Sequence, residues 1–155
     1  MIKFNTLIFT SRSYEPLETA GGQVPDPDYI KGIIELTIDG QEIITRAEWD
    51  LVDQLWAYIV HGGCELARRR SFTTRFPDQP IELLFTVDVA TDSVTVELRY
   101  PGIGRPAKAN VPRGEFIEAI VGAAEPVFRR LIDMAPANRD GYDAVLRQID
   151  GLKHA

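Results

Sequence analysis

A ten-residue segment, 29–38, constrains the fold more than any other part of this 155-residue chain. Positions 30, 32, 34, 36 and 38 are apolar or glycine, and the residues between them include Lys31, Glu35 and Thr37. Such alternation is typical of a strand with one buried face. Asp39-Gly40 follows directly, and a type I′ turn favours this pair because both central residues need a positive φ. The segment therefore predicts an antiparallel hairpin whose second strand is 41–44.

A helix is predicted to follow this hairpin. Thr45-Arg46-Ala47-Glu48 matches a capping box, in which the threonine caps the helix and the glutamate reaches back to it. Apolar side chains then recur every three or four residues up to about Arg70, as on one buried helix face. Gly62-Gly63 interrupts the stretch, and each glycine lowers helix propensity by about 1 kcal/mol relative to alanine, which predicts a bend there. The stripe consists of Trp49, Val52, Trp56, Ile59, Gly63 and Leu66.

The rest of the chain is read from the same periodicities. Further strands are predicted at 2–9, 81–89, 94–100 and 107–111. An amphipathic helix begins near Arg113, and Pro126 inside it predicts a kink or a new helix start. Pro136 closes that segment, and Asp140 is expected to cap a last short helix.

The two halves of the chain resemble each other. Each places a hairpin before a segment with arginine, then glutamate, then an aromatic residue, at Arg46-Ala47-Glu48-Trp49 and at Arg113-Gly114-Glu115-Phe116. The pattern predicts an α+β fold, an antiparallel meander sheet with helices packed on one face and a ββα–ββα internal duplication. Its elements are expected in the order three strands, one helix, three strands and two helices.

Length and composition predict one domain that spans 1–155. Hydrophobic residues make up 45% of the chain, which suits a folded core, and a chain of this length buries about two thirds of its surface. Within the domain, 11–28 contains two glycines and three prolines without any periodicity, which predicts a long polar loop that is functional or mobile. Residues 136–155 are expected to form a C-terminal helical extension.

Several function classes are disfavoured by the composition. Cys64 is the single cysteine, which excludes an intramolecular disulfide and suits a reducing, cytoplasmic location. The opening residues lack the apolar block of a signal peptide, and no window has the roughly 20 apolar residues of a membrane span. The net charge of −6 argues against nucleic acid or an anionic membrane as the main partner.

No cofactor or metal is predicted. His154 is the only histidine besides His61, so no histidine and cysteine cluster has metal-ligand spacing. The segment 101–106 contains Gly-Ile-Gly but lacks the third glycine and the following lysine of phosphate-binding loops. His61 and Cys64 lie one helical turn apart, which is the arrangement of an activated thiol, although no third orienting group is recognisable around them.

Arg68-Arg69-Arg70, with Arg75 after it, is the one basic concentration. Cations at the end of a helix complement its dipole, and this is the interpretation we favour. Phe72 and Phe76 flank the run, an arrangement that is also compatible with a phosphate or single-stranded RNA site.

The acidic excess is concentrated at the start of the chain. Residues 1–60 carry a net charge of −6, residues 61–113 carry +2 and residues 114–155 carry −2. Such a patch is expected to steer a basic protein partner, and tyrosine is common in binding hot spots. The predicted partner-binding residues are Tyr14, Glu15, Glu18, Asp26, Asp28, Tyr29, Glu35, Glu42, Asp50 and Asp53.

The hypothesis that follows is a non-enzymatic bacterial protein, a toxin-neutralising immunity protein that covers its partner's active site with this acidic surface. Two alternatives remain open. One is a small hydrolase or transferase that uses His61, Cys64 and nearby carboxylates. The other is a homodimeric assembly protein that pairs through an exposed edge strand, for which 41–44 is the candidate.

Overall fold

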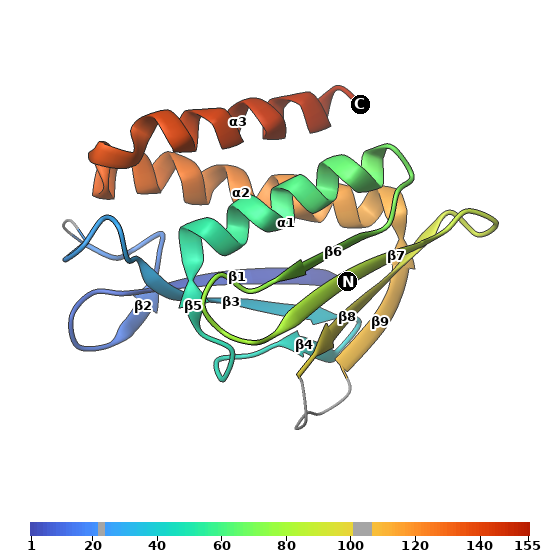
Figure 1. Cartoon of the computed structure of the whole chain (residues 1–155), viewed down its shortest axis with the longest axis horizontal. Coiled ribbons are helices and arrows are strands. Elements are labelled where there is room, and N and C mark those ends of the chain that lie inside the picture. Colours follow the sequence, from blue (N-terminus) through green and yellow to red (C-terminus); the bar gives the residue numbers. More distant parts are fainter. Residues whose placement is uncertain (22–23, 101–106) are drawn as a thin grey trace.

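The computed structural model describes residues 1–21, 24–100 and 107–155. They form an α+β fold in which two antiparallel sheets lie on one side and three α-helices cover them (Figure 1). The first sheet has the strand order β2-β1-β3-β4 with β5 paired to β3, and the second is a meander, β6-β7-β8-β9. The strands are β1 (Ile2–Phe9), β2 (Tyr14–Pro16), β3 (Lys31–Ile38), β4 (Gln41–Ile44), β5 (Asp50–Leu51), β6 (Phe72–Arg75), β7 (Glu82–Asp88), β8 (Ser93–Arg99) and β9 (Ala107–Pro112).

The fold class and the placement of the helices are confirmed, and the single sheet becomes two sheets that meet at β4 and β9. Asp39 and Gly40 have φ values of 48° and 81°, so the predicted turn joins β3 to β4. Because β4 packs against β9 and β8, Ile43 and Ile44 are fully buried. Strand β4 is the outer strand of its sheet, as the homodimer hypothesis supposed, and its contacts with β8 and β9 partly cover that edge.

The helices are α1 (Val52–Ala67), α2 (Arg113–Met134) and α3 (Arg139–Lys153), with a short 3-10 turn at Pro136–Asn138 before α3. The first two helices contact the sheets, and α3 lies across them as the outermost element (Figure 1). Helix α2 continues through Pro126 without interruption. The last helix begins at Arg139, one residue before the predicted cap, and no side chain caps it.

The core lies between the helices and the sheets. Trp56 of α1 is fully buried, and its Nε1 donates a hydrogen bond to Thr6 Oγ1 at 3.0 Å, which fixes the helix over β1. The rings of Phe85 and Phe116 meet edge to face at 5.0 Å, which joins the second sheet to α2. Aromatic pairs in this geometry add about 0.5–1.5 kcal/mol beyond their burial.

The glycine pair in α1 permits close packing. A Cβ on Gly62 would lie 2.7 Å from ring carbons of Phe72 and Phe85, and one on Gly63 would lie 3.3 Å from Leu152. The helix is continuous through both residues. The sequence predicted a bend because it shows the helix propensity of glycine and does not show the aromatic rings packed against it.

The start of α1 differs from the prediction. The expected capping-box contacts do form, since Glu48 Oε1 accepts from the Thr45 N–H at 2.8 Å, but they close a separate turn and α1 begins at Val52. Pairing of Asp50 with Gly32 of β3 keeps the chain extended between the turn and the helix. In the second half, α2 begins at Arg113 directly after β9, whereas in the first half a turn and β5 separate β4 from α1. The two helices therefore do not begin at equivalent positions, as the predicted duplication would require.

The described residues of the segment 11–28 include a strand and two core positions. Its residues 14–16 form β2 on the outer side of β1, and Leu17 and Ala20 are buried in the core. The predicted order of elements therefore lacked three short strands, β2, β5 and β6. The segment 101–106, with its Gly-Ile-Gly, lies outside the described residues.

Candidate functional site

Asp50 holds a loop and does not belong to an acidic surface. Its side chain is 1% exposed, because β5 places it beneath the loop 77–80. Its oxygens accept the backbone N–H groups of Asp78 at 2.9 Å and of Gln79 at 2.8 Å. The prediction that Asp50 faces a partner is therefore wrong, and Asp50 also precedes α1, although the predicted helix included it. Spacing alone did not show that the chain is still extended at Asp50.

Asp53 lines a groove between α1 and α3. The groove has a volume of about 440 Å³ and lies where the first turns of the two helices meet. Its polar lining includes Asp53 and Gln54 of α1 and Asn138 and Asp140 at the start of α3. The apolar lining consists of Ala57, Phe128, Ala137 and Val145.

A hydrogen-bonded chain holds the carboxylate of Asp53 in place. Tyr142 donates its hydroxyl to Asp53 Oδ2 at 2.8 Å, and Asn138 Nδ2 donates to the tyrosine oxygen at 3.1 Å. Burial raises the pKa of Asp53 above its ordinary value although the tyrosine bond lowers it. Burial and then the adjacent carboxylate raise the pKa of Tyr142. The groove therefore holds a carboxyl group whose charge is poorly solvated, and a cation that enters would stabilise that charge.

Asp53→Asn is expected to separate stability from binding. The amide oxygen still accepts from Tyr142, and the charge that burial disfavours is removed. Because the folded state raises the pKa of Asp53, this group supports folding most at low pH, and that support is lost as the pH rises through its folded pKa. We expect the variant to melt at or above the wild-type temperature at neutral pH, and the gain to vanish below the ordinary pKa of the carboxyl. A clear drop in melting temperature at neutral pH would contradict this account of Asp53.

The loop before β3 lies next to this groove. Asn138 Nδ2 donates to the Pro27 carbonyl at 2.6 Å, and Asp26 Oδ1 accepts the Asp28 N–H at 2.9 Å. Tyr29 is 44% exposed, and its hydroxyl donates to Asp78 Oδ2 at 2.9 Å. The hydrogen bond to Asp78 raises the pKa of Tyr29. Together with the groove, these residues form a surface that we call the loop end: Asp26, Asp28, Tyr29, Asp53, Asn138, Asp140 and Tyr142.

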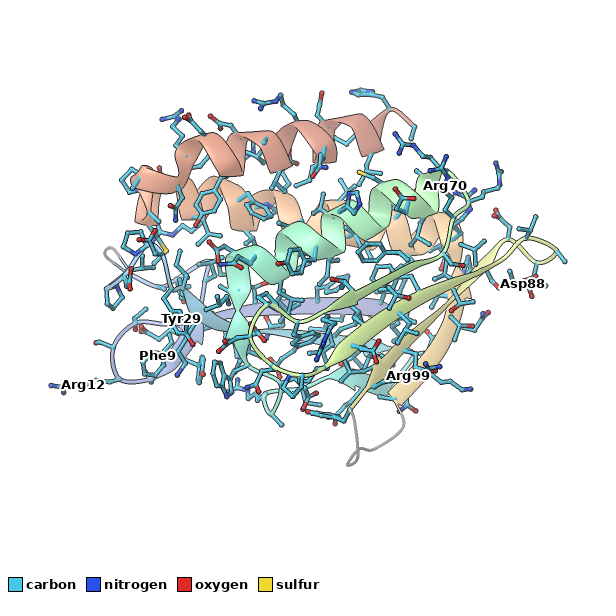
Figure 2. The ribbon with its side chains drawn as sticks, in the orientation of Figure 1. Phe9, Arg12, Tyr29, Arg70, Asp88 and Arg99 are labelled. Carbon is cyan, nitrogen blue, oxygen red and sulfur yellow. The ribbon has the colours of Figure 1, made fainter. Side chains whose placement is uncertain are left out.

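An aromatic patch adjoins the loop end on the outer face of the first sheet. The Nζ of Lys31 lies 4.5 Å from the ring centre of Trp49 and 5.1 Å from that of Phe9. Tyr14 lies beside Phe9, with 5.2 Å between their ring centres. Figure 2 shows Phe9 and Tyr29 at the same end of the molecule, with Arg12 at the outer tip of the loop between β1 and β2. The sequence pointed to Tyr14 and Tyr29 and missed Phe9, Lys31 and Trp49, which only the fold brings together.

The structure places three of the other predicted residues away from the loop end: Glu18, Glu35 and Glu42. Glu35 lies farther along β3 than Lys31. Its carboxylate accepts a hydrogen bond from Asn5 Nδ2 at 3.1 Å and lies 3.6 Å from Arg46 Nε. Glu42 lies on β4, opposite Thr37 and farther along the same sheet. The hydroxyl of Thr10 donates to Glu15 on β2. Glu18 borders a separate cavity of about 190 Å³ between β1 and α2.

His61 and Cys64 do not form an activated pair. The histidine is exposed and meets the ring of Phe72 edge to face at 5.6 Å. Burial raises the pKa of the half-buried Cys64 thiol, whereas a reactive cysteine needs a lowered one. Across the described residues, no three or more histidine, cysteine, aspartate or glutamate side chains lie where they would hold a metal ion.

Comparisons of the chain with protein-family models, with curated protein sequences and with solved structures gave no match. None of the helices within the described parts of the chain has the length and apolarity needed to cross a membrane.

Proposed function

We propose that this chain is a non-enzymatic binding protein that captures a basic protein partner at the loop end. The observation that carries the proposal is the half-buried carboxylate of Asp53 in an open groove with an apolar floor. Burial disfavours its charge, and the groove leaves the carboxylate open to a cationic group that would stabilise that charge. Residues that cost stability and face a cavity are typical of functional sites.

The groove suits the side chain of an arginine or lysine. Its volume of about 440 Å³ is in the range of ligand sites. The floor of Ala57, Phe128 and Val145 would cover the methylene groups, and Asp53 and Asp140 would accept from the charged head. A guanidinium has five N–H donors in a planar fork, which can serve two carboxylates at once.

The aromatic patch supports a protein partner. Phe9, Tyr14 and Trp49 offer large, rigid contact area at low entropy cost, and tryptophan and tyrosine are enriched in binding hot spots. The ammonium group of Lys31 lies over the rings of both Phe9 and Trp49 in cation–π contacts. Carboxylates at the loop end would steer a basic surface toward the patch and raise the association rate at low salt.

Within this class, a toxin-neutralising immunity protein is the role that we propose. A small acidic protein that binds a basic partner by a groove and a neighbouring aromatic face can cover that partner's active site without chemistry of its own. The enzyme alternative is weaker because the raised pKa of Cys64 opposes the nucleophile that it needs.

Capture from an extract of the cell of origin tests the binding role. Wild-type protein on beads is expected to retain a basic protein that salt releases, and the triple variant Asp26→Asn, Asp28→Asn and Asp53→Asn is expected to lose it. The triple variant Glu115→Gln, Glu118→Gln and Asp150→Asn removes the same charge from exposed positions of α2 and α3 outside the loop end. Equal capture by both triple variants would contradict a role for the loop end.

The captured partner then tests the immunity role. Its expression alone is expected to stop cell growth, and co-expression of the wild-type chain is expected to restore growth, whereas the loop-end triple variant is not. A partner whose expression is harmless would contradict the immunity role and leave the binding role in place.

A further inference from the structure

The cavity that Glu18 borders lies between β1 and α2, beside the chain that follows β2. Its volume is about 190 Å³, which is far more than one water molecule needs and less than the roughly 300 Å³ at which sites for drug-sized ligands begin. The apolar part of its lining consists of Phe4, Leu17, Ala123 and Val127. A molecule that fills this cavity would therefore be small and would carry some apolar surface.

Arg130 brings to this cavity a positive charge that has no ion-pair partner among the described residues. It lines the cavity from α2 and is half-buried. One of its terminal N–H groups donates to the carbonyl of Ala20, and its Nε is buried with no hydrogen-bond partner in the part of the chain that the structure describes. The neighbouring Arg129, by contrast, pairs with Glu125 at 3.1 Å. A guanidinium has five N–H donors, so a carboxylate in the cavity would supply acceptors that the described parts of the chain do not.

Pro126 frees a backbone acceptor at the same cavity. Because proline has no N–H, the carbonyl of Gly122 lacks the donor that the fourth residue along a helix supplies. Both residues line the cavity, and a Cβ added to Gly122 would meet nothing within 4 Å, so the space beside it is open. Arg130 follows about 12 Å farther along the axis of α2, and side chains of a helix lean toward its N-terminus, here toward Gly122. A molecule of a few carbon atoms can therefore span the guanidinium and this carbonyl.

Glu18 adds a negative charge at the rim of the cavity. Its side chain is exposed and borders the cavity, on the segment that the bond from Arg130 to the Ala20 carbonyl holds beside α2. This carboxylate favours a positively charged group in the cavity and disfavours a doubly charged anion such as phosphate. The cavity therefore combines a cation, two acceptors and an apolar lining.

We propose that this cavity binds a small apolar α-amino acid as a free ligand. The carboxylate of the ligand would accept from the guanidinium of Arg130, and its ammonium group would donate to the Gly122 carbonyl in the field of Glu18. Its side chain would pack against Phe4 and Val127. An α-amino acid carries all three groups on one carbon, which matches the three kinds of lining. The inference does not rest on the proposed function, because none of these residues belongs to the loop end.

A titration followed by backbone amide NMR shifts tests this site, with L-valine and L-leucine as the probes. We expect shifts at 17–20 and 122–130 on addition of about 1–10 mM of either amino acid, the range in which weak ligands bind. L-valinamide lacks the carboxylate and should bind about tenfold more weakly or worse, and isovalerate, which lacks the ammonium group, should also bind more weakly than L-valine. Shifts at these positions from inorganic phosphate, with none from the amino acids, would overturn the proposed ligand class.

Two substitutions assign the charged groups. Arg130→Met keeps a long side chain without the charge and should weaken L-valine binding by about tenfold or more. Arg129→Met removes the same charge from an exposed position one residue away and should leave binding unchanged. Glu18→Gln should weaken the binding of L-valine and not that of isovalerate, because only the amino acid brings an ammonium group to the cavity.

Melting curves check that each variant folds. If loss of the bond to Ala20 unfolds Arg130→Met, the exposed substitution Glu18→Gln still separates the two ligands. An absence of shifts at 17–20 and 122–130 with both amino acids up to about 10 mM would overturn the proposal. So would L-valine binding that a folded Arg130→Met variant leaves unchanged, or an effect of Glu18→Gln that is the same for L-valine and isovalerate.

Discussion

Asp50→Ala is expected to lower the free energy of unfolding by about 2–4 kcal/mol, the largest stability effect among the acidic residues predicted to bind a partner. Asp50 is 1% exposed, so the variant leaves the N–H groups of Asp78 and Gln79 without their acceptor at a buried position. Hydrogen bonds to a charged group contribute about 1.5–3 kcal/mol, and buried donors without partners add a further cost. Urea unfolding at neutral pH measures the difference.

Two variants make this measurement specific. Asp50→Asn keeps one acceptor oxygen, so its loss should lie between those of wild type and alanine. Asp133→Ala removes an exposed carboxylate from α2, and such changes usually stay within about 0.5 kcal/mol. A loss for Asp50→Ala no larger than that of Asp133→Ala would show that the 77–80 loop does not depend on Asp50.

The expected loss also bears on the loop end. Asp78, whose N–H Asp50 accepts, receives the hydroxyl of Tyr29 through its side chain. A looser 77–80 loop would free Tyr29 and with it the loop before β3. Asp50 is thus a supporting residue behind the surface, and charge reversal there would confuse unfolding with loss of binding. This is why the binding variants are Asp26, Asp28 and Asp53.

The strands with regular alternation were predictable, because a two-residue period reports directly which face is buried. The hairpin at Asp39-Gly40 and the strand at 107–111 are examples, and both occur in the structure. Short strands carry too few residues for a period, so β5 and β6 left no signal. Their existence depends on distant partners, Gly32 of β3 for Asp50 and Phe85 of β7 for Phe72.

The candidate site was only partly predictable for the same reason. Local charge pointed to Asp53, which lines the groove, and to Asp26 and Asp28, which flank Pro27, whose carbonyl accepts from Asn138 of the groove. We predicted Asp50 to be exposed because no local sequence pattern indicates that the loop 77–80 folds over it. Tyr142 and Asn138 come from the far end of the chain, more than eighty residues from Asp53, and no local pattern links them to it.

We propose that the loop end binds a cationic group, and we expect substitutions there to have a large effect on affinity for such a group. A hexa-arginine peptide at low ionic strength is the probe, because it carries the guanidinium that the groove would accept. Changing Asp53 and Asp140 together to asparagine should weaken its binding by about tenfold or more, since each lost charge-assisted hydrogen bond is worth roughly 1.5–3 kcal/mol. Glu118→Gln with Asp150→Asn removes the same charge from exposed positions elsewhere on α2 and α3 and should change binding little.

The most direct measurement is a titration of the wild-type chain with this peptide, followed by backbone amide NMR shifts. The account predicts that the shifts gather at 26–29, 53–57 and 137–145, and that they shrink in the Asp53 and Asp140 double variant. Shifts spread evenly over all acidic positions, or shifts that the double variant leaves unchanged, would contradict the loop end as the binding surface.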